Sequence, residues 1–213
     1  AANWPAWRGP HGNGHCDETE FATQWTNTAG VEWKVQLPAP GNSTPIVWGN
    51  KVFITQAVEK GARRSVMCFD RADGKLLWQR EVKFSGTETT HGDNPFCAGS
   101  PVTDGERVVA WHGSAGMFCY DLDGKELWQR MDLGEFNHIW GNASSPIIYK
   151  DKVIAYCGPG LRCFLAAFDK KTGADLWKVE LPDAQAKLPK DFFGAWDSPV
   201  LREFEGRAQL LLG

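Results

Sequence analysis

The chain has 213 residues, a formal net charge of -3, and 42% apolar residues that occur in short runs. This composition excludes a strongly basic surface for nucleic acid and an apolar stretch long enough to cross a bilayer, so we expect neither partner. Eleven Trp against three Tyr is unusual, and large rigid rings at this density are typical of a repeated packing role. The start Ala1-Ala2-Asn3 fits either signal-peptidase cleavage or an artificial terminus, and we expect a periplasmic or secreted protein.

Residues 1–30 are rich in glycine and polar side chains, so we expect a surface segment that leads into the first repeat. His11, His15 and Cys16 lie within this segment and superficially resemble a metal cluster. A structural zinc site needs four ligands at regular spacing, and no second ligand pair follows in the sequence. We therefore predict no metal site.

A tryptophan recurs in one setting at Trp33, Trp78, Trp128 and Trp177, with spacings of 45, 50 and 49 residues. In the last three copies an aspartate and a glycine precede it, namely Asp70 and Gly74, Asp121 and Gly124, and Asp169 and Gly173. A Ser/Thr-Pro pair runs in phase with this motif, at Thr44-Pro45, Ser100-Pro101, Ser145-Pro146 and Ser198-Pro199. Each period divides into four short strands, a pattern that predicts β-propeller blades because the strands of a sandwich do not recur in sets of four.

In chain order, the period places a lone strand at residues 31–37, which would complete the last blade of a longer ring. Blades 1 to 3 are expected at residues 38–83, 84–134 and 135–182, and residues 183–213 begin a fourth blade. The fold class is therefore all-β, a propeller of four-stranded antiparallel blades amounting to about half of a roughly eight-bladed ring. Residues 183–187 fit one helical turn.

Two other ring closures remain open. Two such chains could close one ring, or the strand at Trp33 could join the sheet that begins at Ser198 in a four-bladed ring. Half a ring would expose blade edges, so we also expect a tendency to self-associate.

The turn before each tryptophan has its own chemistry. Its glycine supplies a positive φ and its aspartate caps the turn backbone. On the outer strand of a blade, the tryptophan can lie across the boundary to the next blade and join the two sheets.

Loops that lead into the first strand of a blade reach the central channel of a propeller, where ligands usually bind. The loops at residues 89–94, 137–142 and 192–197 carry the candidate ligand-binding residues His91, Asn94, His138, Trp140, Asn142, Trp196 and Asp197. Tryptophan stacking and hydrogen bonds from His or Asn would suit a sugar, a quinone or a peptide. For any single residue the alternative is a turn cap or a channel-filling ring.

The six cysteines permit disulfides without requiring them. Cys157 and Cys163 flank a five-residue turn, a spacing that permits a disulfide across a hairpin. Cys68 and Cys119 occupy the motif position where the third copy has Ala167, so we expect them to be small buried packing residues.

The repeated Asp-x-x-(Thr/Asp)-Gly-x-x-x-Trp motif resembles the Trp-docking motif of the pyrroloquinoline-quinone (PQQ)-like propeller repeat. That family includes quinoprotein dehydrogenases and the lipoprotein subunit of the outer-membrane β-barrel assembly machinery. The start Trp4-Pro5-Ala6-Trp7-Arg8-Gly9-Pro10 is similar to the first segment of exported members without assigned function. The resemblance implies the fold, whereas the family contains both catalysts and scaffolds.

Two functions follow as expectations. In the family, dehydrogenases hold PQQ with adjacent cysteines, a tryptophan platform and calcium ligands; this sequence has no Cys-Cys pair, and Asn142 and Asp197 align with no ligand position. We therefore expect an exported, non-catalytic binding or scaffold propeller without a cofactor, whose ligand is a protein or a carbohydrate. The alternative is a PQQ- or quinone-dependent alcohol or sugar dehydrogenase, with PQQ and Ca²⁺, whose remaining site residues lie beyond this chain.

Overall fold

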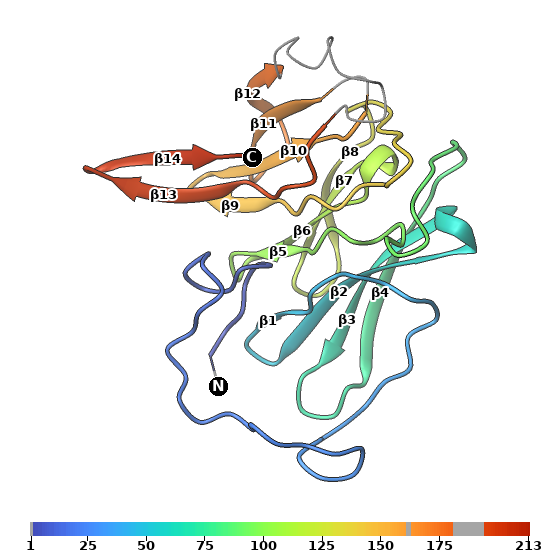
Figure 1. Cartoon of the computed structure of the whole chain (residues 1–213), viewed down its shortest axis with the longest axis vertical. Coiled ribbons are helices and arrows are strands. Elements are labelled where there is room, and N and C mark those ends of the chain that lie inside the picture. The colour runs from blue at the N-terminus through green and yellow to red at the C-terminus, as the bar shows by residue number, and fades with distance from the viewer. Residues whose placement is uncertain (1, 161–162, 181–193) are drawn as a thin grey trace.

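Antiparallel sheets radiate one after another along the chain in the computed structural model, which describes residues 2–160, 163–180 and 194–213 (Figure 1). Blade 1 contains β1 (Ile46–Trp48), β2 (Lys51–Val58), β3 (Arg63–Asp70) and β4 (Leu76–Lys83). Blade 2 contains β5 (Val102–Thr103), β6 (Arg107–Trp111), β7 (Met117–Asp121) and β8 (Glu126–Arg130). Blade 3 contains β9 (Ile147–Tyr149), β10 (Lys152–Cys157), β11 (Phe164–Asp169) and β12 (Asp175–Glu180).

A two-stranded sheet of β13 (Val200–Phe204) and β14 (Arg207–Leu211) begins the fourth blade. In each four-stranded sheet the spatial order of the strands is their order in the chain, which is the meander of a propeller blade. The prediction of four-stranded antiparallel blades is confirmed, and the sheets fall within the residue ranges expected for them. In the described ranges the helical elements are two short 3₁₀ turns, η1 (Glu59–Gly61) and η2 (Gly113–Ala115), and no helix there is long and apolar enough to cross a membrane.

The core lies between neighbouring blades. Ile46, Phe53 and Val66 of blade 1 pack with Val108 and Phe118 of blade 2, all essentially inaccessible to solvent. A second cluster joins blades 2 and 3 in the same way. Cys68 and Cys119 are fully buried in these clusters, which confirms their expected packing role.

The recurring tryptophans join consecutive blades, as predicted. Trp78 on β4 donates its indole N–H to Leu122 O in blade 2 at 3.0 Å, and Trp128 on β8 donates to Lys170 O in blade 3 at 3.0 Å. The docking turn must carry glycine because Gly173 has φ +72° and an added Cβ would lie 2.7 Å from the Trp128 ring. Trp78 and Trp128 therefore each dock on the blade that follows their own.

The residues of the Ser/Thr-Pro pairs form a second connection between blades. The backbone N–H of Thr44 donates to Ser100 Oγ at 2.9 Å, that of Ser100 to Ser145 Oγ at 2.9 Å, and that of Ser145 to Ser198 Oγ at 2.8 Å. Ser100, Ser145 and Ser198 are buried, so these bonds satisfy backbone donors that water does not reach. We call this chain of bonds the serine ladder.

The strand expected at residues 31–37 is not formed, which corrects the prediction. A strand needs a hydrogen-bonded neighbour, and no described strand pairs with this segment. Trp33 holds it instead, donating its indole N–H to Arg71 O at 2.7 Å and lying against Gly74. Trp33 thus contacts the docking turn of blade 1 although it does not lie on a strand. The helical turn predicted at residues 183–187 lies outside the described residues.

The disulfide that the spacing permits between Cys157 and Cys163 is not formed in this structure, which corrects that expectation. The register of the hairpin explains the difference, because Cys157 faces Phe164 rather than Cys163. A shift of one residue moves a side chain to the opposite face of a sheet. Cys163 Sγ instead donates to Gly160 O at 3.1 Å.

Candidate functional site

Aromatic rings from the loops before β9 and β13 pack together. The His138 and Trp196 rings meet edge to face with centroids 4.9 Å apart, and Trp140 lies 5.2 Å from Trp196 and 5.6 Å from His138. We call His138, Trp140 and Trp196 the aromatic platform. The sequence placed these residues on two channel-facing loops, and the structure brings the three rings together.

Hydrogen bonds from the platform's own loops fix the position of Trp196. Its indole N–H donates to Gly141 O at 2.8 Å, and the preceding Ala195 N–H donates to the buried Tyr156 hydroxyl at 2.9 Å. Burial raises the pKa of the Tyr156 phenol, so the hydroxyl stays protonated. Gly141 has φ +74°, and any Cβ there would overlap Thr90, so only glycine fits this crossing.

The loop before β5 supports the platform from the side of blade 2. Asn94 Nδ2 donates to Trp140 O at 2.6 Å, and Thr89 Oγ1 donates to His138 O at 3.0 Å. In these bonds, polar side chains of one loop are hydrogen-bonded to backbone carbonyl oxygens of the next. Three loops from three blades are therefore tied into one unit.

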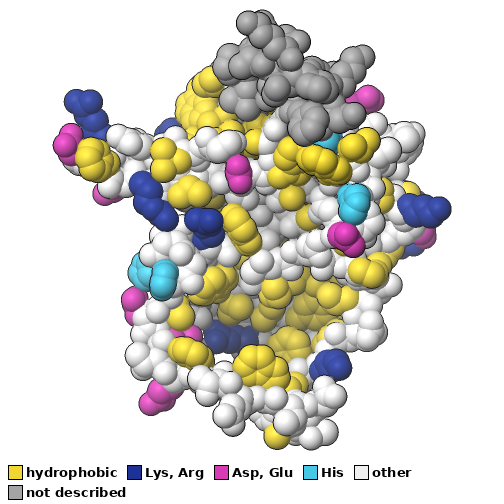
Figure 2. Space-filling model, viewed as in Figure 1, with side chains coloured by type: hydrophobic (Ala, Val, Ile, Leu, Met, Phe, Trp, Pro, Cys, Tyr) yellow, Lys and Arg dark blue, Asp and Glu magenta, His cyan; other side chains and the backbone are white. Residues whose placement is uncertain are grey.

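The solvent-facing part of the platform is apolar. Trp140 is 42% exposed and its neighbour Ile139 is 51% exposed, whereas His138 is only 6% exposed. Charged side chains of both signs are scattered over the face seen in Figure 2, with no continuous patch of one sign. A rigid exposed tryptophan on a well-bonded base suits recognition of an apolar or planar partner group.

The remaining predicted ligand residues do not join the platform. His91 lies in its own loop with its Nδ1 3.5 Å from Asp93 Oδ2, and Asp197 is exposed beside Gly213. Asn142 directs its amide towards the backbone of blade 3, where Nδ2 donates to Gly158 O. Of the seven candidates, His138, Trp140, Trp196 and Asn94 form one site.

A buried ion pair close to Asn142 carried no sequence signal. The Arg64 guanidinium pairs with the Glu88 carboxylate, and both side chains are almost completely buried. Arg64 Nε also donates to Gly61 O at 2.9 Å, and its guanidinium lies 4.8 Å from the Phe84 ring centroid. Arg64 lies between Arg63 and Ser65 at the polar start of β3, and a charged residue in such a setting normally faces water. Burial raises the pKa of Glu88.

His112 lies next to this pair and is 2% exposed. Burial, and secondarily the Arg64 charge, lowers the pKa of His112 to about 3, so the ring is neutral at physiological pH. Among the described residues neither ring nitrogen has a hydrogen-bond partner, and the ring packs against Phe118 with centroids 5.9 Å apart. His112 is therefore a packing residue.

The described residues do not provide a ligand set for calcium. Calcium takes six to eight oxygen ligands, and no group of three or more His, Cys, Asp or Glu side chains in the described ranges is placed to hold a metal ion. The buried Glu88 carboxylate already pairs with Arg64. Asn142 and Asp197, the two residues of suitable type, take separate positions.

Comparisons with known proteins agree with this architecture. The family described as outer membrane protein assembly factor BamB matches residues 18–83 and 57–201. A quinohemoprotein alcohol dehydrogenase, ADH-IIG of Pseudomonas putida, is 23% identical over 185 residues, 81% of this chain and 24% of that protein.

Two solved structures share the fold. The quinohemoprotein alcohol dehydrogenase of Comamonas testosteroni superposes with a TM-score of 0.60 at 15% identity, over 94% of this chain and 33% of that chain. ADHIIG from Pseudomonas putida HK5 gives a TM-score of 0.57 at 18% identity, over 80% of this chain and 28% of that chain. The chain thus spans about a quarter to a third of the relatives it matches.

Proposed function

The chain belongs to the family of the outer membrane protein assembly factor BamB, and from this premise we propose that it is an exported, non-catalytic propeller that binds a protein partner. The observation that carries the proposal is the aromatic platform, an exposed tryptophan held by three mutually bonded loops. Its polar groups are used internally, so it offers a partner an apolar contact surface rather than a set of reactive groups.

The partner class rests on the family description and on the shape of the surface. A family named for protein assembly favours a protein partner, and interface hot spots are enriched in tryptophan on a rigid base. Trp140 and Ile139 would form the centre of such a contact. We also propose that the protein is periplasmic or secreted, in keeping with a family named for outer membrane protein assembly.

Site-specific photo-crosslinking tests this proposal. A photoreactive phenylalanine analogue at Ile139 should crosslink to a protein of the same compartment, and Trp140→Ala should abolish the crosslink. The same analogue at Phe204, which is 60% exposed on the β13–β14 hairpin, is the matched control. Equal crosslinking from both positions, or crosslinks to glycan alone, would contradict a protein-binding platform.

A quinone-dependent dehydrogenase is the second candidate, favoured by the 23% identity with a quinohemoprotein alcohol dehydrogenase. The described residues offer no calcium site, so any cofactor would depend on residues elsewhere in a longer protein. Addition of PQQ and calcium to the protein, followed by a dye-linked assay with primary alcohols and sugars, separates the two candidates. Oxidation that depends on both additions would overturn the binding proposal.

A further inference from the structure

The first strand of each blade has one residue in an equivalent register position. Val47, Thr103, Ile148 and Leu201 each follow the Pro of the Ser/Thr-Pro pair by two positions. In the antiparallel ladder, alternate residues direct N–H and C=O away from their own sheet. Ile148 pairs with Val153 across β9 and β10 as Val47 pairs with Val52 across β1 and β2.

The N-terminal segment already occupies this position in the first two blades. Trp4 and Val47 exchange two backbone hydrogen bonds of 2.8 Å, and Thr103 N–H donates to Pro5 O at 2.9 Å. Trp4 and Pro5 thus add a short extended backbone to the inner edges of β1 and β5, and we call residues 4–12, which include the turns that follow, the N-terminal strap. The chain itself demonstrates how a peptide binds there.

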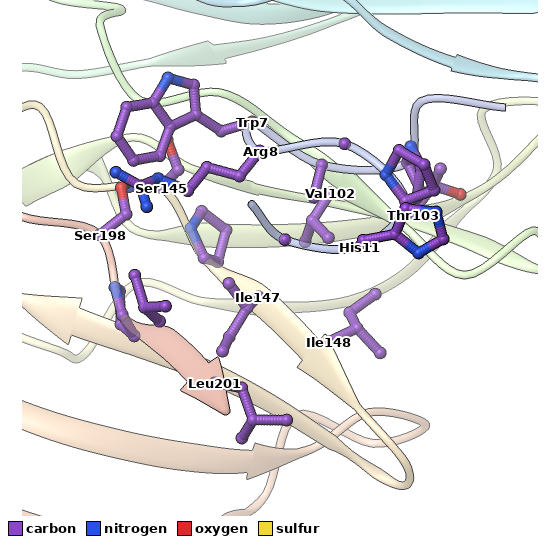
Figure 3. A pocket seen from close by; sticks show the side chains of 18 residues that line it. Trp7, Arg8, His11, Val102, Thr103, Ser145, Ile147, Ile148, Ser198 and Leu201 are labelled. Carbon is purple, nitrogen blue, oxygen red and sulfur yellow. Dashed lines mark hydrogen bonds between the residues drawn. The ribbon is translucent and has the colours of Figure 1, made fainter. Parts of the chain in front are cut away.

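In blades 3 and 4 the equivalent residues line a cavity instead. A cavity of about 270 Å³ lies between strap residues 5–12 and strands β5, β9 and β13, with Ile148 and Leu201 in its wall (Figure 3). In the described part of the chain, no hydrogen bond reaches the N–H or C=O of Ile148 on this open edge. Leu201 O differs, because it accepts a bond of 2.8 Å from Arg202.

The lining of the cavity has a clear chemical character. Val102, Ile147, Ile148 and Leu201 supply an apolar floor, and Arg8 lies at the mouth between Trp7 and the two serines (Figure 3). No lining residue is acidic. The Arg8 guanidinium lies 5.0 Å from the Trp7 ring centroid, and the ion pairs found among the described residues do not include Arg8. An occupant with an apolar group and a carboxylate would complement both features.

We propose that this cavity binds an extended peptide segment that adds to the inner edge of β9. A backbone N–H and C=O of the peptide pair with Ile148 as Trp4 pairs with Val47. An apolar side chain fills the space between Ile148 and Leu201, and an adjacent carboxylate pairs with Arg8. The site is distinct from the aromatic platform and does not depend on it.

The size of the cavity agrees with this occupant. Pockets for drug-sized ligands measure roughly 300–1,000 Å³, and this one is smaller. One or two apolar side chains fit, with the backbone along the edge of β9. The recognition mode is β-strand addition, in which backbone bonds give affinity and a pocket gives selectivity.

Binding of the blocked, fluorescently labelled tetrapeptide Ala-Val-Ala-Glu, followed by fluorescence anisotropy, tests the proposal. Ile148→Pro removes the outward N–H without breaking a ladder bond, because proline is tolerated on edge strands. It should weaken binding about fivefold to tenfold, whereas Ile148→Ala keeps the N–H and should weaken it less. Arg8→Gln should weaken binding and reduce its salt dependence, and Arg207→Gln on β14 is the control for loss of charge.

A second probe keeps the proposal falsifiable if Ile148→Pro impairs folding, which circular dichroism reports. The same peptide with an N-methylated valine lacks the N–H that pairs with Ile148 and should bind the unaltered protein about fivefold to tenfold more weakly. Equal binding of both peptides would overturn strand addition at β9. No binding up to about 1 mM peptide, where even a contact of about -4 kcal/mol is detectable, would overturn the site.

Discussion

Replacement of the docking glycine by alanine should have two costs, the strain of a left-handed backbone and the overlap of the new Cβ with a tryptophan ring. Two glycines of this chain allow the two costs to be measured separately. Gly173 and Gly206 have nearly the same φ, +72° and +71°, but an added Cβ meets the Trp128 ring at 2.7 Å in the first and nothing within 4 Å in the second. In Gly206→Ala only the left-handed conformation is penalised, at about 1–2 kcal/mol. In Gly173→Ala the ring must also move, which adds about 1–3 kcal/mol of overpacking.

Urea unfolding of both variants, monitored by tryptophan fluorescence, measures the difference. We expect Gly173→Ala to lose about 1–3 kcal/mol more than Gly206→Ala, together with a change in native emission because the Trp128 indole moves away from Lys170 O. Equal losses in the two variants would show that the tryptophan does not rest on the turn, and the blade-to-blade account of the repeat would fail.

Ser145→Ala should cost about 1–3 kcal/mol, because it leaves the buried Ser100 N–H without an acceptor, whereas Ser144→Ala, at a buried hydroxyl with no described partner, should be nearly neutral in thermal unfolding. The pKa of His112, lowered to about 3 by burial, lies below its unfolded value near 6.5, so its contribution to stability is complete above about pH 6.5 and is lost as the pH falls towards 3. The loss of unfolding free energy between pH 7 and pH 5 should therefore be smaller in His112→Phe than in the unaltered protein, by up to about 2 kcal/mol. The same loss in both proteins would contradict this. Cys16 is the one cysteine that is not buried, so a thiol reagent without reductant should label it first and should titrate all six thiols only after unfolding; fewer than six would contradict free cysteines.

The blades were predictable because their signals are local and repeated. The Asp-x-x-x-Gly turn needs only a positive φ and a capping carboxylate, and Asp70 Oδ1 does accept from Ala72 N–H at 2.8 Å beside Gly74. The sequence also showed that the Ser/Thr-Pro pair recurs in phase with the tryptophan motif. The role of this pair in the serine ladder was not visible in the sequence, because the donor and the acceptor are about 50 residues apart and belong to different blades.

The site was predictable only as a set of loops. The position of a loop in the sequence indicates that it faces the channel, but it does not show which side chains contact one another. His91 and Asp197 lie on the predicted loops and do not join the platform. The strand expected at residues 31–37 failed for a related reason, since strand formation depends on a partner elsewhere in the fold. The Arg64–Glu88 pair was missed because a charged residue in a strand normally faces water.

In both connections between blades, the hydrogen-bond donor belongs to the earlier blade and the acceptor to the later one. The two ends of the row of blades are therefore not equivalent. Blades 1 and 2 each give a backbone N–H of the Ser/Thr-Pro pair and an indole N–H to the blade that follows, so blade 2 acts as donor towards blade 3 and as acceptor towards blade 1. Loss of the following blade orphans two donors, whereas loss of the preceding blade leaves only acceptor oxygens, which water satisfies more easily. A pulling force or a protease should therefore dismantle the array most readily from its N-terminal side, because loss of the first blade leaves no orphaned donor on the blade that remains.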